Sequence, residues 1–170
     1  MDLIYSFNEI SHILIDFECI TKFRIGLFDN HFHEILSYPS RLSNFCKTIR
    51  SDESLNLQCQ QCDYHSFQHC KSHGHSYVYQ CHLGLTEIIV PIKTNSSIIG
   101  YLMCGQIFTQ NISYENFIRQ YPHISSTSVD LKQLKSTLHN KKIVTKDIIA
   151  STTRFMNILH ITYHMPNTFF

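Results

Sequence analysis

Hydrophobic and polar positions along the chain change their period several times, and each change marks an expected element. From Leu3 to Phe17, apolar residues recur every three or four positions, which is the spacing of a helix that buries one face. Residues 23–28 alternate between apolar and polar, as in a half-buried strand, and residues 76–81 are rich in Tyr and Val, which are common in strands. In chain order the pattern predicts a helix that ends near residue 19, strands at 23–28 and 33–38, helices at 40–50 and about 54–72, strands at 76–81, 86–92 and 98–108, and helices at 113–121, 130–139 and 145–165.

This order predicts an α+β fold in which five strands form one antiparallel sheet. Helices are inserted after the second strand, and one helix flanks the sheet at each end of the chain. The arrangement is typical of PAS- and GAF-like domains, in which the inserted helices and the sheet enclose a pocket. A length of 170 residues suits a single domain, here 1–170, with its core at about 4–110 and its C-terminal helices at about 113–165.

Composition and charge narrow the classes of partner. The formal net charge is +1, so no bulk electrostatic attraction favours nucleic acid. No stretch approaches the ~18 uninterrupted apolar residues of a membrane span. The first twenty residues include Asp2 and Glu9 and lack the basic start of a secretory signal. The expectation is therefore a cytoplasmic protein without a membrane partner.

Cysteines concentrate in one stretch, residues 45–92, which holds five of the seven. Cys59 and Cys62 form a Cys-x-x-Cys pair, whose thiolates can reach one tetrahedral ion. Cys46 and Cys81 are the best candidates to complete a four-thiolate site, which would favour zinc or another thiolate-bound metal. Buried free thiols that pack as small hydrophobic groups are an equally open interpretation, and redox sensing is a third.

Signatures of catalysis are absent from the sequence. There is no Gly-x-Ser-x-Gly motif, no glycine-rich phosphate loop and no paired carboxylates, so an enzyme is not expected. Tyr79, His82 and Gln106 lie beside strand glycines or aromatic residues, as polar groups of a ligand pocket do. With Phe28 and Tyr38 they make up the predicted ligand-binding set.

The order and spacing of six short motifs resemble the PocR sensory domain over about residues 4–110. These motifs are Phe45-Cys46-Lys47-x-Ile49-Arg50, Cys59-x-x-Cys62-Asp63, Tyr79-x-Cys81-His82-x-Gly84-Leu85, Pro91-Ile92, Ile99-Gly100-x-Leu102 and Gly105-Gln106. Residues at the characteristic positions of the family are Cys46, Cys59, Asp63, Cys81, Gly84 and Gln106. Cys62 departs from the family pattern, which leaves His82 as an alternative fourth ligand to a metal.

The resemblance implies a PAS-like domain that senses a small organic molecule, such as a short diol or another hydrocarbon derivative. The signal would pass to an attached output domain, often an AraC-type helix-turn-helix, which is expected to lie outside these 170 residues. DNA would then be contacted only through that domain. A homodimer is expected, and the terminal helices, 1–17 and 145–165, either make its contacts and the output or fold onto the sheet.

Three hypotheses follow. The favoured one is a small-molecule-sensing domain of a bacterial transcription regulator. The alternative is a metal or redox sensor in which the cysteines are the receptor. An enzyme built on a PAS-like scaffold is the third, and it requires a perturbed acid/base pair in the pocket.

Overall fold

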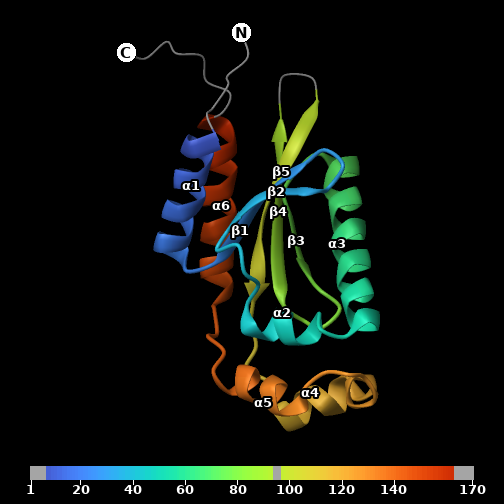
Figure 1. Cartoon of the computed structure of the whole chain (residues 1–170). Coiled ribbons are helices and arrows are strands. Elements are labelled where there is room, and N and C mark those ends of the chain that lie inside the picture. Colours follow the sequence, from blue (N-terminus) through green and yellow to red (C-terminus); the bar gives the residue numbers. More distant parts are fainter. Residues whose placement is uncertain (1–6, 94–96, 163–170) are drawn as a thin grey trace.

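The computed structural model describes residues 7–93 and 97–162, and its elements follow the predicted order (Figure 1). The elements are α1 (Phe7–Thr21), β1 (Arg24–Asp29), β2 (Glu34–Tyr38), α2 (Asn44–Ile49), α3 (Glu53–His73), β3 (Tyr77–Gln80), β4 (Thr86–Lys93), β5 (Ile98–Ile107), α4 (Tyr114–Gln120), the 3₁₀ helix η1 (Pro122–Ser126), α5 (Leu131–His139) and α6 (Lys146–Thr162). The predicted helical segments 1–6 and 163–165 lie outside the described residues, as does most of the turn before β5.

The five strands form one antiparallel sheet in the order β2-β1-β5-β4-β3. The strand β5 is central and pairs with β1 on one side and β4 on the other, so the N-terminal hairpin joins the strands from the middle of the chain there. The helices α2 and α3 are inserted between β2 and β3. This arrangement confirms the predicted α+β fold with a five-stranded antiparallel sheet, and it is consistent with a PAS-like domain.

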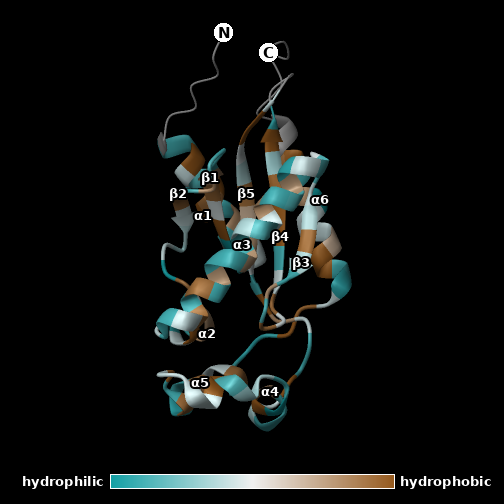
Figure 2. Ribbon diagram, turned by 90° about the vertical axis from the view of Figure 1, so that its right-hand side faces the viewer, coloured by the Kyte–Doolittle hydropathy of each residue, from teal (hydrophilic) through white to brown (hydrophobic). Residues whose placement is uncertain are grey.

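Each face of the sheet packs against different helices, because successive residues of a strand point to opposite sides. Ile88 and Val90 belong to the core that includes residues of α1 and α6, whereas Ile89 packs with Phe67 of α3 and Tyr101 of β5. Figure 2 shows α3 in front of the sheet, with hydrophilic colours alternating along it and brown stretches in the strands behind. The sheet therefore separates the space beneath α3 from the terminal helices.

A third core lies at one end of the sheet, where α2 meets the helices that follow β5 (Figure 1). Phe45 packs edge-on against Phe117, with ring centroids 5.6 Å apart. Asp52 ties this layer to α3. Its Oδ1 caps the helix by accepting from the Leu55 N–H, and its Oδ2 accepts from both the N–H and the hydroxyl of Ser128.

Capping residues explain where several helices begin and end. Ser113 and Asp130, which were expected inside the helices at 113–121 and 130–139, are their N-caps. The helix predicted over 40–50 is shorter and begins at Asn44, because Ser43 caps it and accepts from the Cys46 N–H. Gly74 ends α3 in the left-handed conformation, with φ 68°.

The terminal helices fold onto the sheet, which is one of the two arrangements that the sequence allowed. Leu14 and Phe17 of α1 join Ile149 and Met156 of α6 in one core cluster. The Phe17 ring stacks on that of Phe155 with centroids 5.7 Å apart. None of the helices in the described ranges has the length and apolar character that a bilayer span requires.

Replacing Phe17 by alanine is expected to lower the free energy of unfolding by about 3–5 kcal/mol, because it opens a cavity between α1, α6 and the sheet. Phe17 is 1% exposed. Ile20→Ala on the same helix is the matched control, since Ile20 is 71% exposed and its loss should change stability by less than about 0.5 kcal/mol. Urea unfolding followed by circular dichroism measures both. Equal effects of the two variants would contradict the packing of α1 on α6.

Candidate functional site

A cavity of about 250 Å³ lies between the sheet and the inserted helices α2 and α3. Its walls come from β1, β2, β4 and β5 on one side and from the two helices on the other. The lining residues are Arg24, Phe28, Glu34, Leu42, Cys46, Arg50, Cys59, Asp63, Cys81, Glu87, Met103, Gly105 and Gln106. We call this space the sensor cavity. Its lining is mixed, because charged groups of both signs alternate with apolar side chains and thiols.

Glu87 is the most deeply buried charged residue of the cavity, at 6% exposure. It stands in β4 beside Ile88, and the alternation of the strand turns it towards α3. Burial, reinforced by the nearby Asp63 carboxylate, raises the pKa of Glu87 from 4.5 to about 8. The carboxyl is therefore mostly protonated at neutral pH and can donate a hydrogen bond.

The strand β5 makes room for Glu87. A Cβ atom on Gly105 would collide with the Glu87 carboxylate, so a glycine is required there. The next residue, Gln106, has φ 63° and directs its backbone N–H to Glu87 Oε1 at 2.9 Å. Its side-chain Oε1 accepts from the Ser43 N–H at 2.6 Å. One residue thus connects the buried carboxyl to the residue that caps α2.

A chain of polar contacts joins α2, α3 and β3 along another wall. The Arg50 guanidinium donates to Asp63 Oδ2 at 2.9 Å, and the Tyr79 hydroxyl donates to Asp63 Oδ1 at 3.0 Å. Burial raises the pKa of Tyr79 far above its ordinary value, with the Asp63 charge acting in the same direction, so the phenol keeps its proton. Asp63 thus holds an arginine from α2 and a tyrosine from β3.

Arg24 closes the side of the cavity next to β2. Its Nη2 donates to Glu34 Oε2 at 2.8 Å and to the Ser37 hydroxyl at 2.8 Å. The Nε atoms of Arg24 and Arg50 are buried, and neither has a hydrogen-bond partner within residues 7–93 and 97–162. Buried donors without partners are uncommon, and a bound molecule is one way to satisfy them.

The structure brings three of the four predicted metal ligands to the cavity, namely Cys46, Cys59 and Cys81, but Cys62 does not line it. Cys59 Sγ lies 3.1 Å from His82 Nε2. Burial raises the pKa of Cys59 to about 11 and that of Cys81 to about 12, so both are protonated thiols at neutral pH. In the described part of the chain, no three His, Cys, Asp or Glu side chains are placed to hold a metal ion. Zinc binding stays a prediction.

The predicted ligand-binding residues occupy different positions around the cavity. Phe28 and Gln106 line it. Tyr79 and His82 do not line it, but they contact two lining residues, Asp63 and Cys59 respectively. Tyr38 is not brought to the cavity, because it lies at the edge strand β2, where its side chain is 38% exposed.

Sequence reasoning left out several residues that line the cavity, above all Arg24, Arg50 and Glu87. A signal for Glu87 was present, since it is a lone acid in the otherwise apolar run Leu85–Ile92 apart from Thr86. A charge inside a buried strand is rare unless it has partners. Arg50 and Asp63 stood within the family motifs, but their pairing depends on how α2 and α3 lie against each other.

Comparison with known proteins gives two findings. A family model described as the sensory domain found in PocR matches residues 4–164, which extends beyond the 4–110 region covered by the sequence motifs. The regulatory protein PocR of Salmonella typhimurium (strain LT2) is 26% identical over 102 residues, which amount to 60% of this chain. The aligned region is 33% of that relative, so the chain corresponds to about a third of its length.

Glu87→Gln is expected to change how stability depends on pH. Between pH 4.5 and about 8 the native Glu87 holds a proton that the unfolded chain has released. The free energy of unfolding of the wild type therefore falls as pH rises through this window, by at most about 1.4 kcal/mol per pH unit. The variant lacks this contribution and should gain stability relative to the wild type over the same window.

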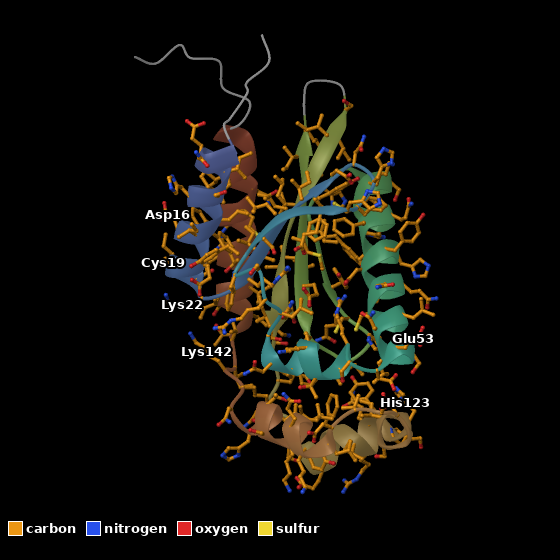
Figure 3. The ribbon with its side chains drawn as sticks, viewed as in Figure 1. Asp16, Cys19, Lys22, Glu53, His123 and Lys142 are labelled. Carbon is orange, nitrogen blue, oxygen red and sulfur yellow. The ribbon has the colours of Figure 1, made fainter. Side chains whose placement is uncertain are left out.

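Urea unfolding of both proteins from about pH 5 to about pH 8 tests this expectation. Glu53→Gln serves as the control, because Glu53 is exposed at the start of α3 (Figure 3). A constant difference between wild type and Glu87→Gln across the range would show that Glu87 is ionised in the folded protein.

Proposed function

We propose that this chain, which belongs to the family of sensory domains found in PocR, binds a small organic molecule in the sensor cavity and passes that signal to an attached regulatory output. The family membership supports a sensory role in a regulatory protein. The ligand class, a short diol or another small hydroxylated hydrocarbon, comes from the family resemblance. The aligned region covers only about a third of the relative. The output domain and its contact with DNA are therefore proposed as well.

The observation that carries the proposal is the set of unused donors in the cavity wall. Two buried guanidinium Nε–H groups, of Arg24 and Arg50, have no partner in the described ranges, and Glu87 adds a neutral carboxyl. Hydroxyl oxygens of a small neutral ligand could accept from these donors. Phe28 and Met103 supply apolar surface for its carbon chain. A volume of about 250 Å³ is slightly below the range of about 300–1,000 Å³ for ligand pockets, which suits a small molecule.

The same contacts offer a route for the signal. A ligand that accepts from Arg50 Nε binds the same guanidinium whose Nη2 donates to Asp63, and so acts on the contact between α2 and α3. A ligand against Gln106 acts on the Ser43 cap at the start of α2. The occupied cavity would favour one arrangement of these helices and of the sheet that carries α1 and α6. A homodimer that senses such a shift through its terminal helices is the form that we expect.

Catalysis is the weaker alternative for this cavity. The raised pKa of Glu87 is a feature that active sites share with binding sites. A binding role is preferred because the family is a sensory one.

A cysteine-based metal or redox sensor is the second candidate function, and one observation favours it. Cys46, Cys59 and Cys81, from three different elements, border the same cavity, and His82 lies in contact with Cys59. Binding a metal would require these buried thiols to lose protons, which a bound cation favours. Closure of such a site would draw α2, α3 and the end of β3 together.

Filling the sensor cavity is expected to weaken ligand binding. Leu42→Trp places a larger side chain in the cavity wall, and the affinity for the ligand should fall by at least about tenfold, equivalent to about 1.4 kcal/mol. Leu57→Trp is the matched control, because Leu57 is 53% exposed on the outer side of α3. Isothermal titration calorimetry with ethylene glycol and its short-chain homologues provides the measurement. Failure of the wild type to bind any of them would overturn the ligand class, and equal affinities of the two variants would place binding elsewhere.

Elemental analysis with thiol titration decides the second candidate. A metal sensor is expected to contain stoichiometric zinc or another soft metal that is lost in Cys59→Ser and kept in Cys19→Ser. Cys19 is the control because it is exposed on α1, far from the cavity lining (Figure 3). Native protein without metal, in which all seven thiols titrate after unfolding, would exclude this function.

A further inference from the structure

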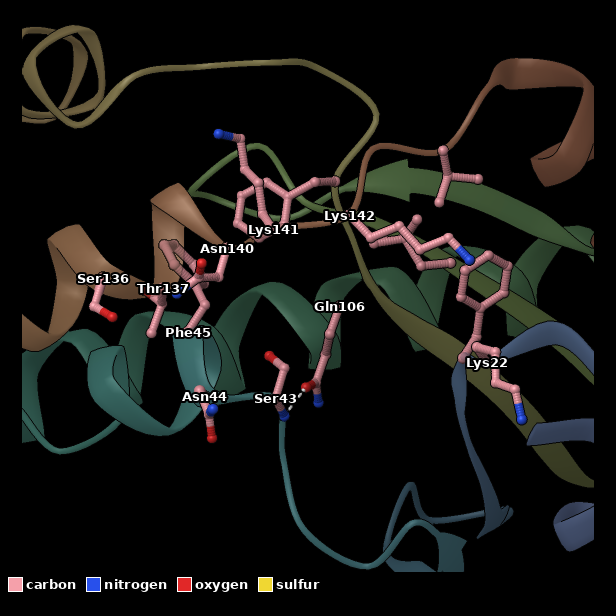
Figure 4. A pocket seen from close by; sticks show the side chains of 14 residues that line it. Lys22, Ser43, Asn44, Phe45, Gln106, Ser136, Thr137, Asn140, Lys141 and Lys142 are labelled. Atoms are coloured by element: carbon pink, nitrogen blue, oxygen red, sulfur yellow. Dashed lines mark hydrogen bonds between the residues drawn. The ribbon is translucent and has the colours of Figure 1, made fainter. Parts of the chain in front are cut away.

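A second hollow, of about 290 Å³, lies on the other side of Gln106 from the sensor cavity. Its wall comes from the residue after α1, the start of α2, the end of β5 and the link between α5 and α6. Its floor is apolar, formed by Phe23, Phe45, Phe108 and Val144. We call it the lysine groove. Figure 4 shows Lys22 and Lys142 at one end, Ser136, Thr137 and Asn140 at the other, and Ser43 with Gln106 between them.

The charge of the lysine groove is of one sign. Three lysines line it, Lys22, Lys141 and Lys142, and no acidic residue does. An adjoining hollow that shares Lys22, Ser43 and Gln106 adds Arg41, with Glu18 as its acidic residue. In the described part of the chain, neither Lys22 nor Lys142 takes part in an ion pair. This contrasts with the sensor cavity, where charges of both signs alternate.

One of the three lysines already has a structural role. Lys141 Nζ donates to the carbonyl oxygens of Ile112 and Leu138, both at 2.7 Å, and so caps the end of α5. Burial lowers its pKa, and no carboxylate offsets that effect. Lys22 and Lys142 have no such contacts. They come from different elements and lie at the same end of the groove (Figure 4), and their ammonium groups have no partner among the residues that the structure describes.

Neutral donors are also free along the groove. The side-chain amide nitrogens of Asn44, Gln106 and Asn140 make no hydrogen bond to any residue that the structure describes. Gln106 uses only its Oε1, towards the Ser43 N–H. The groove thus combines a cationic end, a row of amide and hydroxyl groups, and an apolar floor. These are the features of a site that recognises a small molecule with an anionic group and several polar substituents.

We propose that the lysine groove is a second ligand site, distinct from the sensor cavity, for a small hydroxylated molecule that carries a phosphate or carboxylate group. The anionic group lies between Lys22 and Lys142, and the hydroxyl groups lie along Asn44, Gln106 and Asn140. The size of the groove suits one such molecule. Gln106 belongs to the walls of both sites, so the regulator has adjacent places for a neutral and an anionic ligand.

Glycerol phosphate is the probe for this site, with glycerol and inorganic phosphate as its two fragments. Titrations are followed by two-dimensional amide NMR at constant ionic strength, without any diol present. Glycerol phosphate is expected to shift the amides of Asn140 and Lys142 saturably, and to do so at lower concentration than glycerol or inorganic phosphate. Lys22→Gln and Lys142→Gln should each weaken its binding by about fivefold, the usual effect of losing one exposed charge contact.

Lys132→Gln is the matched control, because Lys132 is exposed on α5 and does not line the groove. Leu42→Trp should leave glycerol phosphate binding intact, since Leu42 lies in the wall of the sensor cavity and not in that of the groove. No saturable binding at millimolar probe would overturn the proposal. So would equal affinity in Lys142→Gln and Lys132→Gln, or loss of binding in Leu42→Trp. Each of these outcomes is independent of whether a diol binds the sensor cavity.

Discussion

The burial of one carboxyl group within the sheet is the constraint on which the sensor cavity depends. Glu87 interrupts a strand whose other residues are almost all apolar, and it is held neutral by the absence of water. Its position requires Gly105, and its carboxyl accepts from the backbone N–H of Gln106. Gln106 in turn adopts a left-handed conformation that only strong surrounding contacts sustain. The Gln106 side chain accepts from the N–H of Ser43, and this contact fixes the beginning of α2.

Such an arrangement does little for stability. Burying a carboxyl costs free energy even when it is protonated, and a half-buried ion pair such as Arg50–Asp63 loses part of its Coulomb energy to desolvation. Apolar residues of the same size would stabilise the fold at least as well. The polar groups around the sensor cavity are therefore best explained by what they can bind, and the unpartnered Nε–H groups of Arg24 and Arg50 agree with that explanation.

The sheet also gives the domain two sides with different tasks. Alternate residues of β4 point to the sensor cavity and to the core that holds α1 and α6, so a single layer of backbone lies between the cavity and these helices. A change in the packing of Glu87 would be transmitted directly to its neighbour Ile88, which lies on the opposite face of the sheet. Membership in a family of regulatory sensory domains suits this layout, in which one face lines the sensor cavity and the other packs against α1 and α6.

The sequence by itself determined the order of elements, the antiparallel fold class and the family. Hydrophobic period and capping residues are local properties, and the strands at 86–92 and 98–108 were placed within one residue of those observed. The predicted set of Cys46, Cys59, Cys62 and Cys81 includes three residues that line one cavity, but Cys62 does not line it. The sequence did not separate Tyr38, at an exposed edge, from Phe28, in the cavity wall.

Only the tertiary structure decided which charged groups meet. Arg24, Glu34 and Glu87 come from three strands, and Arg50 and Asp63 from two helices, so no local pattern relates them. Their proximity follows from strand order and from the angle at which α3 crosses the sheet. The raised pKa of Glu87 likewise depends on the water excluded by helices far away in the chain. A sequence pattern records which face a residue occupies, whereas the chemistry of a buried group depends on everything that covers it.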